Sequence, residues 1–154
     1  MTGADAVPLD PLQALVGAAD ARVPSISDWS VGRHIAHCCL AMSSILQSLG
    51  ESTPPRPPRG FSLRRFAILR LGRIPRGRAQ APKAVVLDDE PEVVRLHELL
   101  ESARELLAEA QRLPADAWFR HFALGVLDRD ECLRFLAVHN AHHVRIAREV
   151  VASA

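Results

Sequence analysis

Histidines are the residues of this chain whose types and spacing could support chemistry. Five of its seven histidines fall in two short segments, with His34 and His37 in the first and His139, His142 and His143 in the second. Neutral imidazole is a common ligand for divalent transition metals. A single histidine is as often a solvated or capping side chain, so the clustering predicts a metal site only if the surrounding elements bring these residues together.

The second group lies in a segment with the pattern of a long helix, over about 128–151. Asp128 can cap its start, and Glu131 three residues later can complete a capping box. Residues four apart lie on one face of a helix, so His139 and His143 could bind the same ion. A third ligand must then come from another helix.

Helical periodicity separates the three histidines of this segment. The face expected to meet the core carries Leu133, Leu136, Asn140, Val144, Ala147 and Val151. His143 flanks this face and His139 lies farther round on the same side, whereas His142 points nearly opposite and is not expected to be a ligand. We expect Asn140 to bond a neighbouring helix, with ordering of the site as the alternative.

A second helix is predicted over 31–49, where it would carry the other histidine pair. Ser30 can cap its start and Gly50 can end it. Its apolar face consists of Val31, Ile35, Cys38, Met42, Ile45 and Leu49. This face places His34 nearer the core edge than His37, so periodicity alone favours His34 as the third ligand.

Two further helices complete the predicted fold. One spans about Pro8 to Ala21, and the other about Glu90 to Leu113, with Pro91 in its first turn and Asp88 or Asp89 as its cap. The buried face of the latter is expected to consist of Val93, Leu96, Leu99, Leu100, Ala103, Leu106, Leu107 and Ala110. The prediction is an all-α fold, a four-helix bundle formed by a single domain over 1–154.

A long basic connection separates the second and third predicted helices. Residues 52–87 contain no acidic residue, six prolines and the eight arginines Arg56, Arg59, Arg64, Arg65, Arg70, Arg73, Arg76 and Arg78. The prolines predict an irregular crossover, although 61–71 could form a short basic amphipathic turn or two. The arginines could hold an anionic cofactor, an acidic partner or nucleic acid phosphates, but a solvated loop is the simplest interpretation.

Composition limits the function classes. The formal net charge is +1, the rest of the chain is acidic and no nucleic-acid-binding motif is present, so nucleic acid is not the expected partner. No leader pattern and no long apolar run occur, which predicts a soluble cytoplasmic protein without a membrane segment.

The three cysteines predict reduced thiols, because their odd number shows no disulfide spacing. Cys38 belongs to the apolar face of its helix, and Cys39 could reach the histidines. Cys132, in the first turn of its helix, could have a lowered pKa, although burial would cancel that effect.

Three segments of the chain resemble a known superfamily. Residues 29–38 (WSVGRHIAHC) resemble the start of the second helix of the DinB-like four-helix metalloproteins. Residues 121–128 (HFALGVLD) and 135–143 (FLAVHNAHH) resemble the turn and the final helix of that superfamily, and the match is closest to a subgroup of unknown function. The resemblance implies that His37, rather than His34, is the first metal ligand and that His139 and His143 are the second and third. His121 could then approach the site, or it could anchor the turn.

Three imidazoles around a divalent ion leave a coordination position open, as in catalytic sites. Zinc is the expected ion, with nickel or iron also compatible. In DinB-like relatives a low-molecular-weight thiol such as bacillithiol or mycothiol is thought to bind there, which implies a metal-dependent thiol transferase or isomerase acting on a small molecule. Hydrolysis is the weaker alternative, because no carboxylate base accompanies the histidines.

Two other interpretations stay open. The protein could bind a metal or ligand without catalysis, or the basic connection could be a binding module for an anionic partner. A second apolar face on the last helix, formed by Phe135, Val138 and Ile146, must be covered by the connection or by a second subunit, so a homodimer is also expected.

Overall fold

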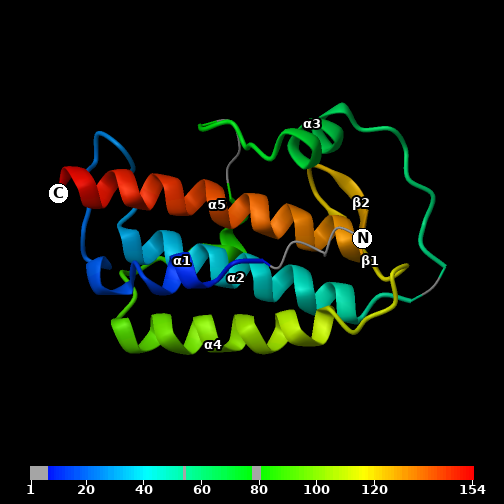
Figure 1. Cartoon of the computed structure of the whole chain (residues 1–154), viewed down its shortest axis with the longest axis horizontal. Helices are drawn as coiled ribbons and strands as arrows, with labels where there is room; N and C mark the ends of the chain where they lie inside the picture. The colour runs from blue at the N-terminus through cyan, green and yellow to red at the C-terminus, as the bar shows by residue number, and fades with distance from the viewer. Residues whose placement is uncertain (1–6, 54, 78–80) are drawn as a thin grey trace.

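Three long helices lie side by side in the computed structural model (Figure 1), which describes residues 7–53, 55–77 and 81–154. They are α2 (Val31–Gly50), α4 (Val93–Ala110) and α5 (Arg129–Ser153), and α2 packs against both of the others. Figure 1 shows that α2 and α4 run in the same direction and α5 in the opposite one. Residues 1–6 of the predicted domain and Arg78 of the predicted basic connection lie outside the described residues.

Helix α2 begins where its cap predicts. The Ser30 hydroxyl accepts a hydrogen bond from the Arg33 N–H at 3.1 Å and donates one to the Glu90 carboxylate. Gly32 lies so close to the preceding segment that a Cβ there would be 3.2 Å from the Ala19 carbonyl and 3.3 Å from Pro91 Cγ. The start of α2 is therefore fixed against both neighbouring segments.

Helix α5 confirms the predicted capping box, in which Asp128 and Glu131 bond each other's backbone N–H groups. Five of the six residues predicted for its core face are buried, but Val151 is 39% exposed and Val150 is buried instead. The buried face continues from Ala147 by a step of three rather than four residues, as a 3.6-residue period allows.

Helix α4 begins later than predicted. Glu92 occupies the N-cap position, so the prediction of Asp88 or Asp89 as the cap is wrong, and Pro91 precedes the helix. Most of the predicted buried face is confirmed, by Leu96, Leu99, Leu100, Ala103, Leu107 and Ala110. Val93 is exposed instead, because it lies at the first residue of the helix.

The N-terminal helix predicted over Pro8 to Ala21 is wrong in length. The chain forms only α1 (Asp10–Gln13) and a 3-10 turn, η1 (Val16–Ala18), because the backbone bonds from Leu15 to Ala19 join residues three apart. Its apolar side chains are still buried in the core, and they are Leu9, Leu12, Leu15 and Val16.

A two-stranded antiparallel sheet contradicts the prediction of an all-α four-helix bundle. Strands β1 (Trp118–His121) and β2 (Gly125–Asp128) form a hairpin, and the described N-terminal residues do not supply a fourth long helix. Gly125 has φ +77°, a conformation that favours glycine and lets the chain enter β2. The prediction misses this hairpin because four-residue strands leave too short an alternation to recognise.

The basic connection is not irregular throughout, which corrects the prediction for 52–87. Ser62 caps α3 (Leu63–Leu71), which ends at Gly72 with φ +63°, and a 3-10 turn, η2 (Lys83–Val85), follows. The nine-residue α3 is longer than the one or two turns expected there and packs against α5 (Figure 1).

Ion pairs hold the start of this connection on the rest of the fold. Arg56 and Arg59 pair with Asp128, at 3.0 and 3.4 Å, and Arg59 also pairs with Glu131. The carboxylates that begin α5 therefore also fix the connection.

The second apolar face of α5 is covered within the chain. Phe135 and Ile146 are both buried, with α3 packed against α5. This face consequently gives no reason to expect a second subunit. Among the described residues, no helix combines the length and the apolar character needed to cross a membrane.

Candidate metal centre

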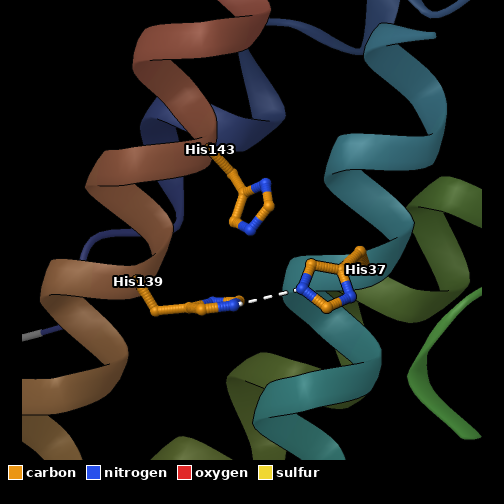
Figure 2. Close-up of side chains that lie close together, drawn as sticks. All are labelled: His37, His139 and His143. Atoms are coloured by element: carbon orange, nitrogen blue, oxygen red, sulfur yellow. Dashed lines mark hydrogen bonds between the residues drawn. The ribbon is translucent and has the colours of Figure 1, made fainter. Parts of the chain in front are cut away.

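The structure brings together the three histidines that the resemblance nominated. His37 comes from α2, and His139 and His143 come from α5, one helical turn apart. One ring nitrogen of each lies within 4.8 Å of the others, and His37 Nε2 lies 3.1 Å from His139 Nε2. In Figure 2 the His143 ring lies over the gap between the other two and points a nitrogen into it. All three face one another across the α2–α5 interface.

His37 is oriented by a backbone carbonyl from the connection. Its Nδ1–H donates to the Val85 carbonyl at 2.8 Å, which leaves the Nε2 lone pair directed at the cluster. Val85 belongs to η2, so the connection that covers the site also selects the tautomer of its first histidine. No sequence signal could have shown this contact, because the acceptor is a main-chain group.

His34 lies behind the cluster and supports it. Its Nδ1 is 2.9 Å from His143 Nδ1, and its Nε2 is 3.0 Å from the Ser27 hydroxyl, which also accepts a hydrogen bond from the Trp29 N–H. The Trp29 ring packs against the histidine rings. The periodicity argument for His34 as a ligand is therefore not supported by its position, and Ser27 is a supporting residue that sequence reasoning missed.

Burial keeps these imidazoles neutral, which is the form that binds metals. Burial, reinforced by the nearby His37, lowers the pKa of His139 to about 3. The pKa of His143 is lowered mainly by burial and then by His139, and that of His37 is lowered by burial in spite of its bond to Val85.

The donor set fits a divalent ion. His139 Nδ1 is buried and has no hydrogen-bond partner within the part of the chain that the structure describes, so the ring is held by packing with one nitrogen free to carry its proton. The facing Nε2 atoms of His37 and His139 can share a proton or bind a cation between them. Three imidazole nitrogens without a carboxylate are a set that zinc, nickel or ferrous iron would accept.

A cavity of about 580 Å³ opens beside the three histidines. Its walls come from α2, α3, the segment 73–77, the β1–β2 hairpin and α5. This volume is typical of sites for small organic molecules. None of the described residues that line it is acidic, so the cavity offers no carboxylate base beside the cluster.

His121 anchors the hairpin turn, as one of its two sequence interpretations expected. Its Nδ1 accepts hydrogen bonds from the Ala123 and Leu124 N–H groups at 3.1 and 3.2 Å, and its ring stacks on Phe122. Burial lowers the pKa of His121 to about 4. The same ring also lines the cavity, so it borders the site without joining the three-histidine cluster.

His142 is buried although helical periodicity places it nearly opposite the core face of its helix. It is only 8% exposed, its ring meets the His143 ring edge-on at 5.2 Å, and it lines the cavity. The segment after α3 lines the same cavity and its Arg76 pairs with Glu149 of α5, so a residue away from the helix core face is buried by tertiary contact. It remains outside the group of three whose nitrogens approach one another.

The three cysteines are free and buried in the described structure. Burial raises the pKa of Cys39 to about 12, and burial together with Asp128 and Glu131 raises that of Cys132 to about 12. The pKa of Cys38 is also raised, by burial and then by Cys39. Burial therefore cancels the effect of the helix start on Cys132, as expected, and the adjacent carboxylates act in the same direction.

Asn140 joins two helices. It is fully buried, and its side-chain amide donates to Met42 Sδ at 3.3 Å. This contact supports the structural interpretation of Asn140. Its Oδ1 has no partner among the described residues.

Comparison with known proteins gives a family but no activity. A family model described as a protein of unknown function, DUF1569, matches residues 12–150. No curated protein matches, and no solved structure matches. The matched range includes all three histidines of the cluster and the hairpin.

Proposed function

We propose that this chain, which belongs to the DUF1569 family of proteins of unknown function, binds one divalent metal ion through His37, His139 and His143 and acts as an enzyme on a small molecule in the adjoining cavity. One observation carries the proposal. Three neutral imidazoles from two helices converge on the wall of a cavity large enough for a substrate. Their sequence resemblance to the DinB-like superfamily supports the same role.

A divalent ion with three imidazole ligands keeps a position for one more ligand and lowers the pKa of a thiol or water bound there. The residues of the chain fix the rings. The Val85 carbonyl orients His37, and His34 with Ser27 orients His143. Zinc is the ion we expect, with nickel or iron as alternatives, because imidazole ligands suit all three.

A low-molecular-weight thiol is the nucleophile that this site suits best. The described cavity lining contains no carboxylate to deprotonate water, and the chain's own thiols are buried with raised pKa values. A nucleophile must therefore come from outside the protein. Transfer or isomerisation with an added thiol uses the cavity without requiring a general base from the chain.

Metal analysis of protein purified without a His-tag tests the metal-binding part. We expect one zinc, nickel or iron per chain, and we expect His37→Ala, His139→Ala and His143→Ala each to lose it. The matched control is His97→Ala, because His97 is an exposed histidine on α4, away from the cluster. A parent chain that stays metal-free after supply of all three metals would contradict the proposal.

Thiol consumption tests the catalytic part. The metal-loaded chain is assayed with bacillithiol, mycothiol and glutathione against a panel of electrophiles, and the matched His139→Ala variant sets the background. Metal-dependent consumption of at least one thiol is the expected result. If the metal-loaded protein consumes none of the thiols, the result would favour a binding protein over an enzyme. A binding protein is the second candidate function because the described cavity lining has no carboxylate base.

A further inference from the structure

We propose that the cavity binds a small apolar molecule carrying one anionic group, and that Arg64 and Arg73 select the anion. This inference names the substrate class of the proposed function and rests on it. It uses residues that the metal-binding proposal does not. The apolar walls, the charge of the lining and the pairing of the arginines support it.

The walls of the cavity are mostly apolar. They include Ile45 of α2, Ile68 of α3, Ile74, Phe119 of β1 and Phe135 of α5. Such walls gain free energy by removing apolar surface of a ligand from water, at roughly 25 cal/mol per Å². The substrate bound in this space is therefore expected to have a hydrocarbon or aromatic body.

The charge of the lining is of one sign. Arg64 and Arg73 line the cavity, and no described lining residue is acidic. A guanidinium matches the geometry of carboxylate, sulfonate and phosphate groups. A cationic ligand would meet two cations there with no counter-charge, so the lining favours an anion.

Four other arginines of the connection are bonded to other parts of the chain. Arg56, Arg59 and Arg76 are paired with carboxylates of α5 or its cap. Arg65 donates to backbone carbonyls. These four arginines attach the connection to the fold.

Arg64 and Arg73 make no such contacts. Within residues 7–53, 55–77 and 81–154, neither forms an ion pair or a side-chain hydrogen bond, and both are exposed. The two arginines that border the cavity are thus available for a ligand, whereas the arginines that hold the segment are occupied.

The position of the two arginines orients the occupant. Arg64 lies in the first turn of α3 and Arg73 follows its end, so both belong to the segment that covers the cavity. The histidine cluster lies on α2 and α5, which form a different wall. The anionic group would lie under the covering segment, with the apolar body extending toward the histidines.

Calorimetric titration with octanoate, 1-octanol and octylamine tests the inference on the full chain. The three ligands share one apolar chain and differ in the charge of the end group. We expect octanoate to bind about tenfold tighter than octanol, the usual size of a charge-assisted hydrogen bond, and octylamine to bind weakest. Equal binding of acid and alcohol, or tighter binding of the amine, would overturn the inference.

Substitution of the arginines gives the matched control. Arg64→Gln with Arg73→Gln should remove the preference for octanoate and leave octanol binding unchanged. Arg70→Gln removes the same charge from the same helix, but Arg70 does not line the cavity, so the preference should remain. An equal loss in Arg70→Gln would show that only the general charge of the segment matters and would overturn the inference.

The same titrations on metal-stripped protein separate this inference from the proposed function. The preference for octanoate should persist without metal, since the arginines provide it. If the protein binds metal but does not prefer octanoate, only the inference about the arginines is overturned. If it prefers octanoate but binds no metal, only the proposed function is overturned. A preference present only with metal and unaffected by the arginine substitutions would assign the anion to the metal and overturn the inference.

Discussion

His34 Nδ1 and His143 Nδ1 lie 2.9 Å apart, so one of these two nitrogens must carry the hydrogen of the bond between them. Figure 2 shows His143 directing its other ring nitrogen into the gap between His37 and His139. That nitrogen can bind a metal only if Nδ1–H donates to His34, and His34 Nε2–H then donates to Ser27 at 3.0 Å. His143, His34 and Ser27 therefore form a chain of hydrogen bonds that fixes the tautomer of His143.

Removal of this support should weaken metal binding without abolishing it. In His34→Phe the ring volume stays but the acceptor for His143 Nδ1–H is lost, so we expect about a 10- to 100-fold loss of zinc affinity. Competition with a chromogenic chelator measures the affinity. Ser27→Ala should cause a smaller loss, and the exposed His97→Phe none. Parent-like affinity in His34→Phe would show that His34 is only a packing residue.

Adjacent histidines on α5 should differ sharply in their effect on metal content. His143 contributes a nitrogen to the cluster, whereas His142 only contacts its ring edge and lines the cavity. We expect His143→Ala to lose the bound metal and His142→Ala to keep one metal per chain in elemental analysis. Circular dichroism shows whether both variants retain their helices. Equal metal loss in the two would assign His142 to the site.

Local signals were sufficient to predict where α2 and α5 begin. Ser30 and Asp128 both accept hydrogen bonds from the turn that follows them, so the caps could be read directly from residue type. The choice of His37 over His34 could not be made in this way. The orientation of His37 depends on the Val85 carbonyl, which lies in a segment far from α2 in the sequence. The sequence pattern of α2 therefore cannot indicate this contact.

The parts of the fold that the sequence did not predict depend on tertiary contacts. The hairpin is held at Trp118, whose backbone N–H bonds the Ser52 hydroxyl and whose indole N–H bonds the Thr53 carbonyl, both at 3.0 Å. These partners follow α2 and are far away in the sequence. The burial of His142, which lies away from the core face of its own helix, also depends on a tertiary contact, because the segment after α3 lines the same cavity.

The native thiols should be unreactive. Cys38, Cys39 and Cys132 are buried, and burial raises their pKa values, to about 12 for the last two. At pH 8 we expect no rapid reaction with Ellman's reagent in the folded chain and reaction of all three cysteines in urea. If one cysteine reacted rapidly in the folded protein, that cysteine could serve as the nucleophile in place of an added thiol. Single Cys→Ser variants would identify it.

Gly125→Ala should destabilise the hairpin. The residue has φ +77°, and a side chain in this left-handed conformation costs about 1–2 kcal/mol. The matched control is Gly60→Ala, because Gly60 has no atoms within 4 Å of an added Cβ and no positive φ. Urea unfolding should show the loss of free energy only for Gly125→Ala. Equal stability of the two variants would mean that the turn relaxes without cost.

Acid should destabilise the metal-free protein through its buried histidines, and His121 gives a test of one of them. Burial lowers its pKa to about 4, so the folded chain keeps it neutral at pH 5, whereas the unfolded chain binds a proton below about 6.5. The unfolded state then binds more protons, so the free energy of unfolding falls as the pH drops from about 6.5 to 4.

The variant His121→Asn measures this contribution, because its amide oxygen can still accept from the Ala123 and Leu124 N–H groups but does not titrate. Linkage gives about 2 kcal/mol for one such group between pH 7 and pH 5. We therefore expect the parent to lose about 2 kcal/mol more than His121→Asn over this interval in urea unfolding. The remaining histidines contribute equally to both chains, so they cancel in the difference. Identical losses would mean that His121 is protonated in the folded protein at pH 5 and that its bonds to the turn are already broken there.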